Sequence, residues 1–313
     1  MPQPSAAQHP AAQAGAHPQT LETLAAAHQV AHLDADLGTV ALLGAHLHDA
    51  LVSTRNSAAL ITGVGGFAGY QDTTRPFHLS QNRMTLRVDT TAPVHVVRHT
   101  AQAGQRTVLC VADAKETIVM RAETGSRHDL NVLSNLQTRG KHSHPPADLR
   151  TGGGVVSLAA VRQARASWAQ RDSGQHLNAL MAEGGTQRAS TLPHIGKGRA
   201  LKIRPEVLPS FLTYLVARQI RHARLVMGCG FCQGDIFENG AIEQLDTIVL
   251  VSQDATNFAL DLTQVSRCWV TRFAQSCQLE IYGADDRPVA VLAADPHSNL
   301  GQWHDLLAAL PAV

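Results

Sequence analysis

The chain has 313 residues, which is enough for two domains of ordinary size, each with its own core. Its formal net charge is only +1 at pH 7, and 4% of its residues are aromatic. These values argue against a broad nucleic-acid surface, a polybasic membrane patch and a platform of stacked rings for single strands. No run of about 18 apolar residues is present, so we expect no membrane-spanning helix.

The first 20 residues are rich in Ala, Gln, Pro and His, and we expect them to form a disordered tail. They have neither a basic start nor a continuous apolar core, so they do not read as a secretory signal. The five cysteines are an odd number and do not indicate a framework of disulfides. We therefore predict a cytoplasmic protein with reduced thiols.

The first unit is predicted from residue 21 to residue 137. Its Ala/Leu/His-rich segment 21–50 reads as helical, with a break near 34–38. Short segments rich in β-branched residues and divided by Gly, Pro, Asn or Asp then predict strands. These strands are 51–56, 57–64, 77–82, 84–89, 94–99, 106–113 and 117–123. A helix over 128–136 closes the unit.

Residues 138–154 combine charge, histidines, a proline pair and three glycines, so we predict a linker there. The second unit, 155–313, opens with helices and continues with strands. The predicted helices are 155–169, 176–183, 205–218 and 300–310, and the strands are 224–230, 233–240, 246–252, 257–262, 267–273, 277–283 and 288–294. Consecutive short strands at hairpin spacing predict antiparallel sheets with helices on their faces or ends.

The two units repeat each other in register. Segment 86–99 aligns with 260–273, and 128–136 aligns with 302–310, at one offset of 174 residues (260 − 86 and 310 − 136). A repeat this long indicates a duplicated domain, because solenoid units run about 20–50 residues. The predicted fold class is α+β with an internal duplication, in which each of two similar domains has a large antiparallel sheet flanked by helices. Ligands tend to bind in the cleft between such domains.

Few short motifs indicate chemistry. Cys229 and Cys232 form a CxxC pair, a spacing used by zinc sites and dithiol redox centres, but no second pair of ligands follows it. The glycine-rich segment 63–69 does not follow the dinucleotide pattern and predicts a turn. His142 and His144, in the linker, are explained better by solvation than by a metal site.

Five segments carry a family resemblance: TRNSAA at 54–59, LRV at 86–88, MGCGFC and IF within 227–237, NFAL at 257–260 and WVTR at 269–272. In the same order, they resemble the T-R-N-x-x-A, D-L-R-L-F, V-G-N-x-G-C-x-Q-I-F-T-G, F-x-L-H-L and W-x-x-R motifs of the bacterial cytoplasmic haem-utilisation proteins of the HemS/HmuS type, also called hemin-degrading factors. No single motif is specific, whereas their order and spacing from about residue 40 to the C-terminus are.

The resemblance implies that haem is the ligand or substrate and that it lies in the cleft between two similar halves. It also implies that the iron is ligated by a His on a helix opening the second half, with an Arg from the D-L-R strand on the other side. These residues match His176 and Arg87. Neutral imidazole is a good axial ligand for ferric iron, and a guanidinium can hold an iron-bound water or oxygen species. We therefore predict His176 as the metal ligand and Arg87 as a second haem-binding residue.

Five positions depart from the family's haem pocket. The Arg on the family's helical segment after the ligand His falls on Ala189 here, although Arg188 is adjacent. The Phe of the D-L-R-L-F strand is Asp89 here, and the basic residue after W-x-x-R is Phe273. A Gln and a Tyr on the late strand are replaced by Val291 and Ala293. A reorganised pocket, weaker haem binding and a different ligand are therefore all retained as hypotheses.

The leading functional hypothesis is a haem-binding protein of haem-iron utilisation. It would either carry haem from an uptake system to acceptor proteins or degrade haem to release iron. Degradation would make it an oxygenase with an external electron donor, because the sequence has no flavin or nicotinamide motif. The alternative is a haem-free divergent paralogue that serves as a binding or interaction module. A thiol or zinc protein that uses Cys229 and Cys232 is a third hypothesis.

Overall fold

The structure is a computed structural model, and it describes residues 19–68, 70–74, 79–80, 84–100, 106–138, 158–168, 170–182, 186–196, 198–274, 276–295 and 297–313. Residues 1–18 of the predicted tail lie outside this part of the chain. So do residues 139–154 of the predicted linker, with His142 and His144, and most of the predicted strand 77–82.

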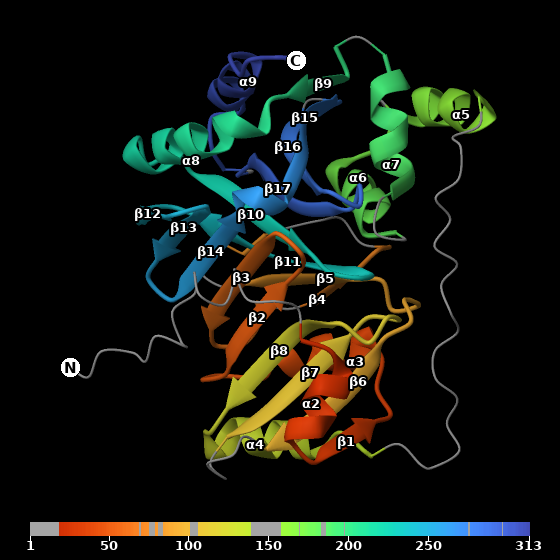
Figure 1. Cartoon of the computed structure of the whole chain (residues 1–313), viewed down its shortest axis with the longest axis vertical. Helices are drawn as coiled ribbons and strands as arrows, with labels where there is room; N and C mark the ends of the chain where they lie inside the picture. The colour runs from red at the N-terminus through yellow and green to blue at the C-terminus, as the bar shows by residue number, and fades with distance from the viewer. Residues whose placement is uncertain are drawn as a thin grey trace.

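A nine-stranded sheet forms the lower and left parts of the view in Figure 1. In spatial order it consists of β1 (Val30–Leu33), β6 (His95–Thr100), β7 (Thr107–Ala112), β8 (Ile118–Thr124), β2 (Leu51–Arg55), β3 (Ala59–Val64), β14 (Thr256–Asp261), β13 (Ile248–Gln253) and β12 (Ala241–Leu245). The helices of the first half are α2 (Leu21–Ala27), α3 (Leu37–Gly44) and α4 (Arg127–Ser134). All the neighbouring strands in this sheet run antiparallel.

An eight-stranded sheet forms the upper part of the same view. Its order is β4 (Tyr70–Asp72), β5 (Thr85–Val88), β11 (Phe231–Phe237), β10 (His222–Met227), β17 (Pro288–Ala294), β16 (Ser276–Gly283), β15 (Val265–Phe273) and β9 (Ala200–Ile203). Its helices are α5 (Leu158–Trp168), α6 (Ser173–Met181), α7 (Thr186–Thr191), α8 (Leu208–Ala217) and α9 (Leu300–Ala308). Of the described helices, none has the length and apolarity that crossing a membrane would require.

The strand order confirms the predicted α+β class and the duplication. The order β1-β6-β7-β8-β2-β3 of the first half recurs as β9-β15-β16-β17-β10-β11 in the second. The next strand in each sheet, however, comes from the other half. Strand β14 pairs with β3, and β5 pairs with β11, so the halves exchange equivalent strands and are joined by two antiparallel ladders (Figure 1). The exchange carries Arg87, on β5, into the second sheet.

The prediction of one broken helix over 21–50 is wrong. Strand β1 lies between α2 and α3 and pairs with β6, where Leu33 is buried against the first sheet. The predicted break is where α3 begins, because the Asp36 side chain caps the helix by accepting a hydrogen bond from Thr39 N at 2.7 Å. Here tertiary pairing overrides the helical composition of the segment.

Strand β16 shows how the second sheet is packed on both faces. Leu279 and Ile281 point into the core that α8 and α9 cover, and they pack there with Trp303. The intervening residues Glu280 and Tyr282 face the opposite side, where α5, α6 and α7 lie. This second face is buried although a carboxylate lies in its centre, so it contains a polar cluster that needs an explanation.

Candidate functional site

Helix α6, which carries His176, begins at a well-formed N-cap. Asp172 accepts a hydrogen bond from Gln175 N at 2.7 Å, and the Gln175 side chain accepts one from Asp172 N at 3.2 Å. The two bonds form a capping box, which fixes where the helix starts. Helix α6 therefore begins at Ser173, three residues before the predicted start, and places His176 within its first turn.

The His176 side chain is completely buried between aromatic rings. Its imidazole stacks on Phe273 with ring centroids 3.8 Å apart, and it meets the edge of Trp168 at 4.6 Å. Nε2 lies 3.1 Å from the carbonyl oxygen of Trp168, and Nδ1 lies 3.1 Å from Nη1 of Arg188. Burial, followed by the charge of Arg188, lowers the pKa of His176 to about 3. The ring is therefore neutral at physiological pH.

The partners of His176 determine which of its nitrogens carries the proton. A carbonyl oxygen can only accept a hydrogen bond, and a guanidinium can only donate one. Nε2 therefore carries the hydrogen, and the lone pair of Nδ1 accepts from Arg188. An iron ligand needs a ring nitrogen with a free lone pair. In this arrangement, neither nitrogen of His176 fits the predicted role as iron ligand.

Glu280 organises the polar cluster around Arg188. The two side chains form a bidentate pair, with Nε to Oε2 at 2.8 Å and Nη2 to Oε1 at 2.5 Å. Thr271, Gln278 and Tyr282 donate further hydrogen bonds to the carboxylate at 2.6, 2.8 and 2.6 Å. Burial alone would raise the pKa of Glu280, but the charge of Arg188 and these hydrogen bonds lower it to about 2. Both members of the buried pair are therefore charged.

Arg87, the second predicted residue, lies on another side of α6. Its Nε donates to Oδ1 of Asn178 at 2.8 Å, and Nη2 lies 3.3 Å from the carbonyl oxygen of Thr73. Asn178 is two residues beyond His176, about 200° around the helix. Arg87 is buried, and burial lowers its pKa from the ordinary value. The structure thus places His176 on α6 and Arg87 against it, with hydrogen-bond partners that differ between the two residues.

Several solved structures are similar to this chain, while no family model and no curated sequence matches it. Apo-PhuS, a heme-binding protein from Pseudomonas aeruginosa, has a TM-score of 0.71 and 16% identity, over 91% of this chain and 87% of that one. Holo-PhuS gives 0.72 and 17%, over 93% and 90%. ChuS, an E. coli heme oxygenase, gives 0.72 and 14%, over 92% and 90%. The chain has the fold of PhuS and ChuS.

Within the PhuS and ChuS fold, four of the five departures from the family pattern lie around His176, among them the buried Ala189. Phe273 stacks on its ring, and Val291 and Ala293 belong to the same apolar cluster. Asp89 has a different role. Its carboxylate accepts hydrogen bonds from the backbone and the hydroxyl of Thr91, at 3.0 and 2.6 Å, and so stabilises the turn after β5. The substituted residues therefore close the surroundings of His176 with apolar groups.

The two cysteines of the CxxC pair are free thiols. Burial raises the pKa of Cys232 to about 12 and also raises that of Cys229. Nucleophilic and metal-binding chemistry requires the thiolate, which burial here disfavours. No group of three His, Cys, Asp or Glu side chains that could hold a metal ion is found in the described part of the chain.

The sequence prediction missed Glu280 and the three residues that donate to it, Thr271, Gln278 and Tyr282. Gln278, Glu280 and Tyr282 alternate with Cys277, Leu279 and Ile281 along a strand in which every residue but the first is buried. Such an alternation of polar and apolar residues was the available signal. It normally predicts a strand with one exposed face, and only the helices packed over that face bury it.

Proposed function

We propose that this chain is a haem-binding protein of haem-iron utilisation. The observation that carries the proposal is the fold, which matches a heme-binding protein and a heme oxygenase over 91–93% of the chain. Motifs that resemble the haem-utilisation family lie on strands of this fold, among them β5 with Arg87 and β15, which ends at Phe273. A cytoplasmic location is part of the proposal.

The proposed binding region is α6 together with the elements that contact it. Arg87 and Asn178 connect α6 to the exchanged strand β5, and Trp168 and Phe273 supply aromatic surfaces beside it. Arg171, which is only partly buried just ahead of α6, is a cation available for a haem propionate. In the proposal, haem is cargo or substrate, and it would have to separate side chains that are now in contact.

Carriage is favoured over degradation by the state of the two predicted residues. Arg87 donates to Asn178 and to a backbone carbonyl, and both nitrogens of His176 are engaged. As the structure stands, neither side chain offers a free group with which to ligate iron or activate dioxygen. We propose that the protein receives haem from an uptake system and passes it intact to acceptor proteins.

The proposal is tested by titrating hemin into the purified protein and following the Soret band. Saturable appearance of a protein-bound Soret band is expected, with Arg171→Gln weakening binding several-fold because a propionate partner is lost. Arg106→Gln is the matched control, because Arg106 is an exposed cation in the first half and pairs with Glu123. Absence of a protein-bound Soret band in the wild type would contradict the proposal.

Addition of ascorbate in air to the hemin complex then separates carriage from degradation. Persistence of the Soret band is expected for a carrier. Loss of the band together with release of iron would instead identify a haem-degrading oxygenase.

One observation favours a haem-free binding module as the second candidate. Phe273, Trp168 and Arg188 surround the His176 ring, which is completely buried. A flat hemin titration with a folded protein would select this candidate over the haem-binding proposal.

A further inference from the structure

We propose that Arg188 is a positioning residue that holds His176 in the Nε2–H tautomer and thereby withholds its imidazole from iron. The proposal rests on the proposed function for its relevance to haem. The tautomer itself is a property of the haem-free protein and can be measured without haem.

Either route to ligation by His176 conflicts with Arg188 or with Trp168. Ligation through Nδ1 needs the lone pair that now accepts from Nη1 of Arg188 at 3.1 Å. Ligation through Nε2 needs the proton on that atom to move to Nδ1. The Nδ1 proton would then point at a guanidinium, which has only donors, so two N–H groups would face each other. Release of Arg188 is therefore required in both cases.

Arg188 is itself firmly held. Nε and Nη2 of its guanidinium donate two charge-assisted hydrogen bonds to Glu280. The guanidinium also lies 4.7 Å from the centre of the Trp168 ring. The Glu280 carboxylate has three further donors, so it is fixed from the sheet side as well. Rotating Arg188 away from His176 would leave a buried charge without its partner.

The opposite nitrogen of His176 faces an equally fixed acceptor. The carbonyl oxygen of Trp168 lies 3.1 Å from Nε2. Trp168 is anchored in turn, because its indole Nε1 donates to the carbonyl oxygen of Arg272 on β15 at 2.7 Å. One acceptor and one donor therefore hold the imidazole on opposite edges, and together they select one tautomer.

The first test measures the histidine tautomer in the haem-free protein by ¹⁵N NMR of the imidazole rings. In the wild type, the His176 ring should show a protonated Nε2 and an unprotonated Nδ1. The double variant Arg188→Met/Glu280→Gln removes both buried charges together, and a mixture of both tautomers is expected. A protonated Nδ1 in the wild type, or an unchanged tautomer in a folded double variant, would overturn the proposal.

A matched control variant is available in the same sheet. Arg224 and Asp235 form another buried bidentate pair, on β10 and β11, where the Arg224 guanidinium lies beside the rings of Phe237 and Phe258. The variant Arg224→Met/Asp235→Asn should leave the His176 tautomer unchanged. Should the Arg188 double variant fail to fold, Arg188→Lys keeps a cation beside Glu280 but removes the planar fork that reaches Nδ1, and the same shift in tautomer is expected.

The second test compares hemin binding with and without the imidazole. His176→Ala should leave the Soret maximum of the wild type unchanged, because the imidazole is not an iron ligand there. In the Arg188→Met/Glu280→Gln background, His176→Ala should weaken hemin binding about tenfold and shift the band, because the released ring then ligates iron. Loss of the wild-type Soret band in His176→Ala would overturn the proposal. Failure of the wild type to bind hemin would contradict the proposed function instead, while the NMR result would stand independently.

Discussion

The two halves use one equivalent strand for different purposes. Strand β5 of the first half carries Arg87 into the second sheet, where the guanidinium contacts Asn178 on α6. At an offset of 174 residues, the equivalent position on β14 is Asp261, whose carboxylate accepts a hydrogen bond from Thr263 N at 3.0 Å and caps a short 3₁₀ helix. The duplication therefore repeats the scaffold, while the side chain at this position contacts a distant helix in one copy and caps the adjoining short helix in the other.

The helices explain this asymmetry. Within the described residues, the first half has only α2 ahead of its edge strand β1, whereas the second half has α5, α6 and α7 ahead of β9. These three helices cover the face of the second sheet that carries Glu280 and Tyr282. A duplicated scaffold thus becomes an asymmetric site through helices added to one copy.

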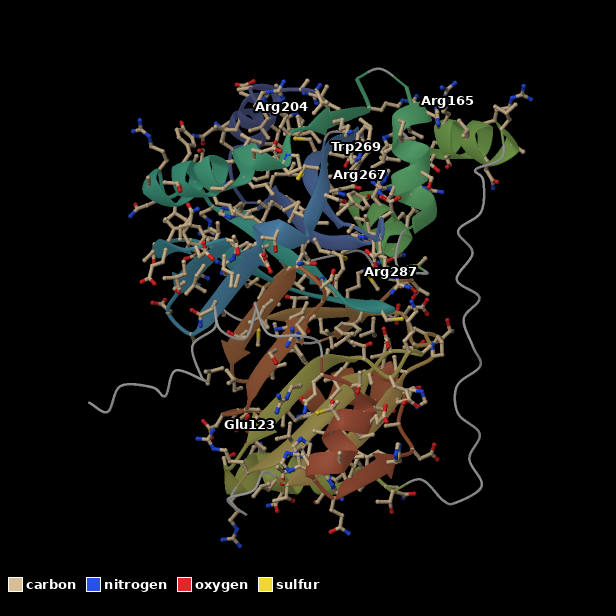
Figure 2. The ribbon with its side chains drawn as sticks, in the orientation of Figure 1. Glu123, Arg165, Arg204, Arg267, Trp269 and Arg287 are labelled. Atoms are coloured by element: carbon tan, nitrogen blue, oxygen red, sulfur yellow. The ribbon has the colours of Figure 1, made fainter. Side chains whose placement is uncertain are left out.

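The largest expected effect comes from breaking the buried pair on the asymmetric side. Arg188→Met should lower the free energy of unfolding by about 3–5 kcal/mol, because Glu280 is left as a buried charge without its partner. Arg106→Met removes an exposed pair with Glu123, labelled in Figure 2, and should cost less than about 1 kcal/mol. Urea unfolding measures both. Equal effects in the two variants would mean that burial does not distinguish these pairs.

A direct comparison of the equivalent strand positions should give the next largest effect. Arg87→Leu should destabilise the protein by about 2–3 kcal/mol, because Asn178 and the Thr73 carbonyl lose a buried charged donor. Asp261→Ala should cost about 1 kcal/mol, the usual effect of losing a helix cap. Chemical denaturation of the two variants measures both losses of unfolding free energy and shows which is larger. A larger loss of stability for Asp261→Ala than for Arg87→Leu would contradict the view that Arg87 makes the more important contact of the two.

The buried histidines of the second half should make stability depend on pH. Burial lowers the pKa of His222 to about 4 and that of His176 to about 3. Below the unfolded value of about 6.5, the unfolded chain takes up protons that the folded chain does not. Stability should therefore be constant above this pH and fall as pH decreases, by about 1.4 kcal/mol per pH unit for each histidine.

Urea unfolding between pH 6.5 and pH 5 measures this slope. Arg188, Arg171 and Glu280 act on the charge of His176, and Arg224 and Asp235 act on that of His222. In His222→Gln, the unfolding free energy should fall less steeply with decreasing pH, because one of the two buried histidines is gone. An equal pH dependence in this variant and in the wild type would contradict the lowered pKa of His222.

The smallest effect is expected at the CxxC pair. Cys229→Ser should leave both hemin binding and metal content unchanged, because burial keeps this thiol protonated. Metal analysis of the purified wild type and the variant checks this. Zinc lost only in the variant would restore the third functional hypothesis.

Local sequence signals predicted most strands and the duplication, but they did not predict the strand exchange. The predicted segments 94–99 and 246–252 are rich in β-branched residues, and this local pattern is sufficient to identify them. Strand β12 was missed because it is a short, exposed edge strand with a single β-branched residue, Ile242. Pairing between β5 and β11 joins residues far apart in the chain, and no local pattern specifies it.

The sequence predicted His176 and Arg87 as residues of the candidate site, but it did not predict their hydrogen bonds. Family resemblance led to His176 and Arg87, and both contact or lie on α6. Their hydrogen-bond partners depend on side chains from α5, α7 and β16 that meet only in the folded protein. The identity of a residue at one position cannot show whether a neighbour such as Arg188 occupies its lone pair.

Transfer of haem to an acceptor tests the central claim most directly. The protein would be loaded with hemin, separated from free hemin and mixed with an excess of apo-myoglobin under air. The account predicts that intact haem appears in the Soret band of the globin while the carrier loses its own. Failure to load the protein with hemin, or disappearance of haem without transfer, would contradict the account.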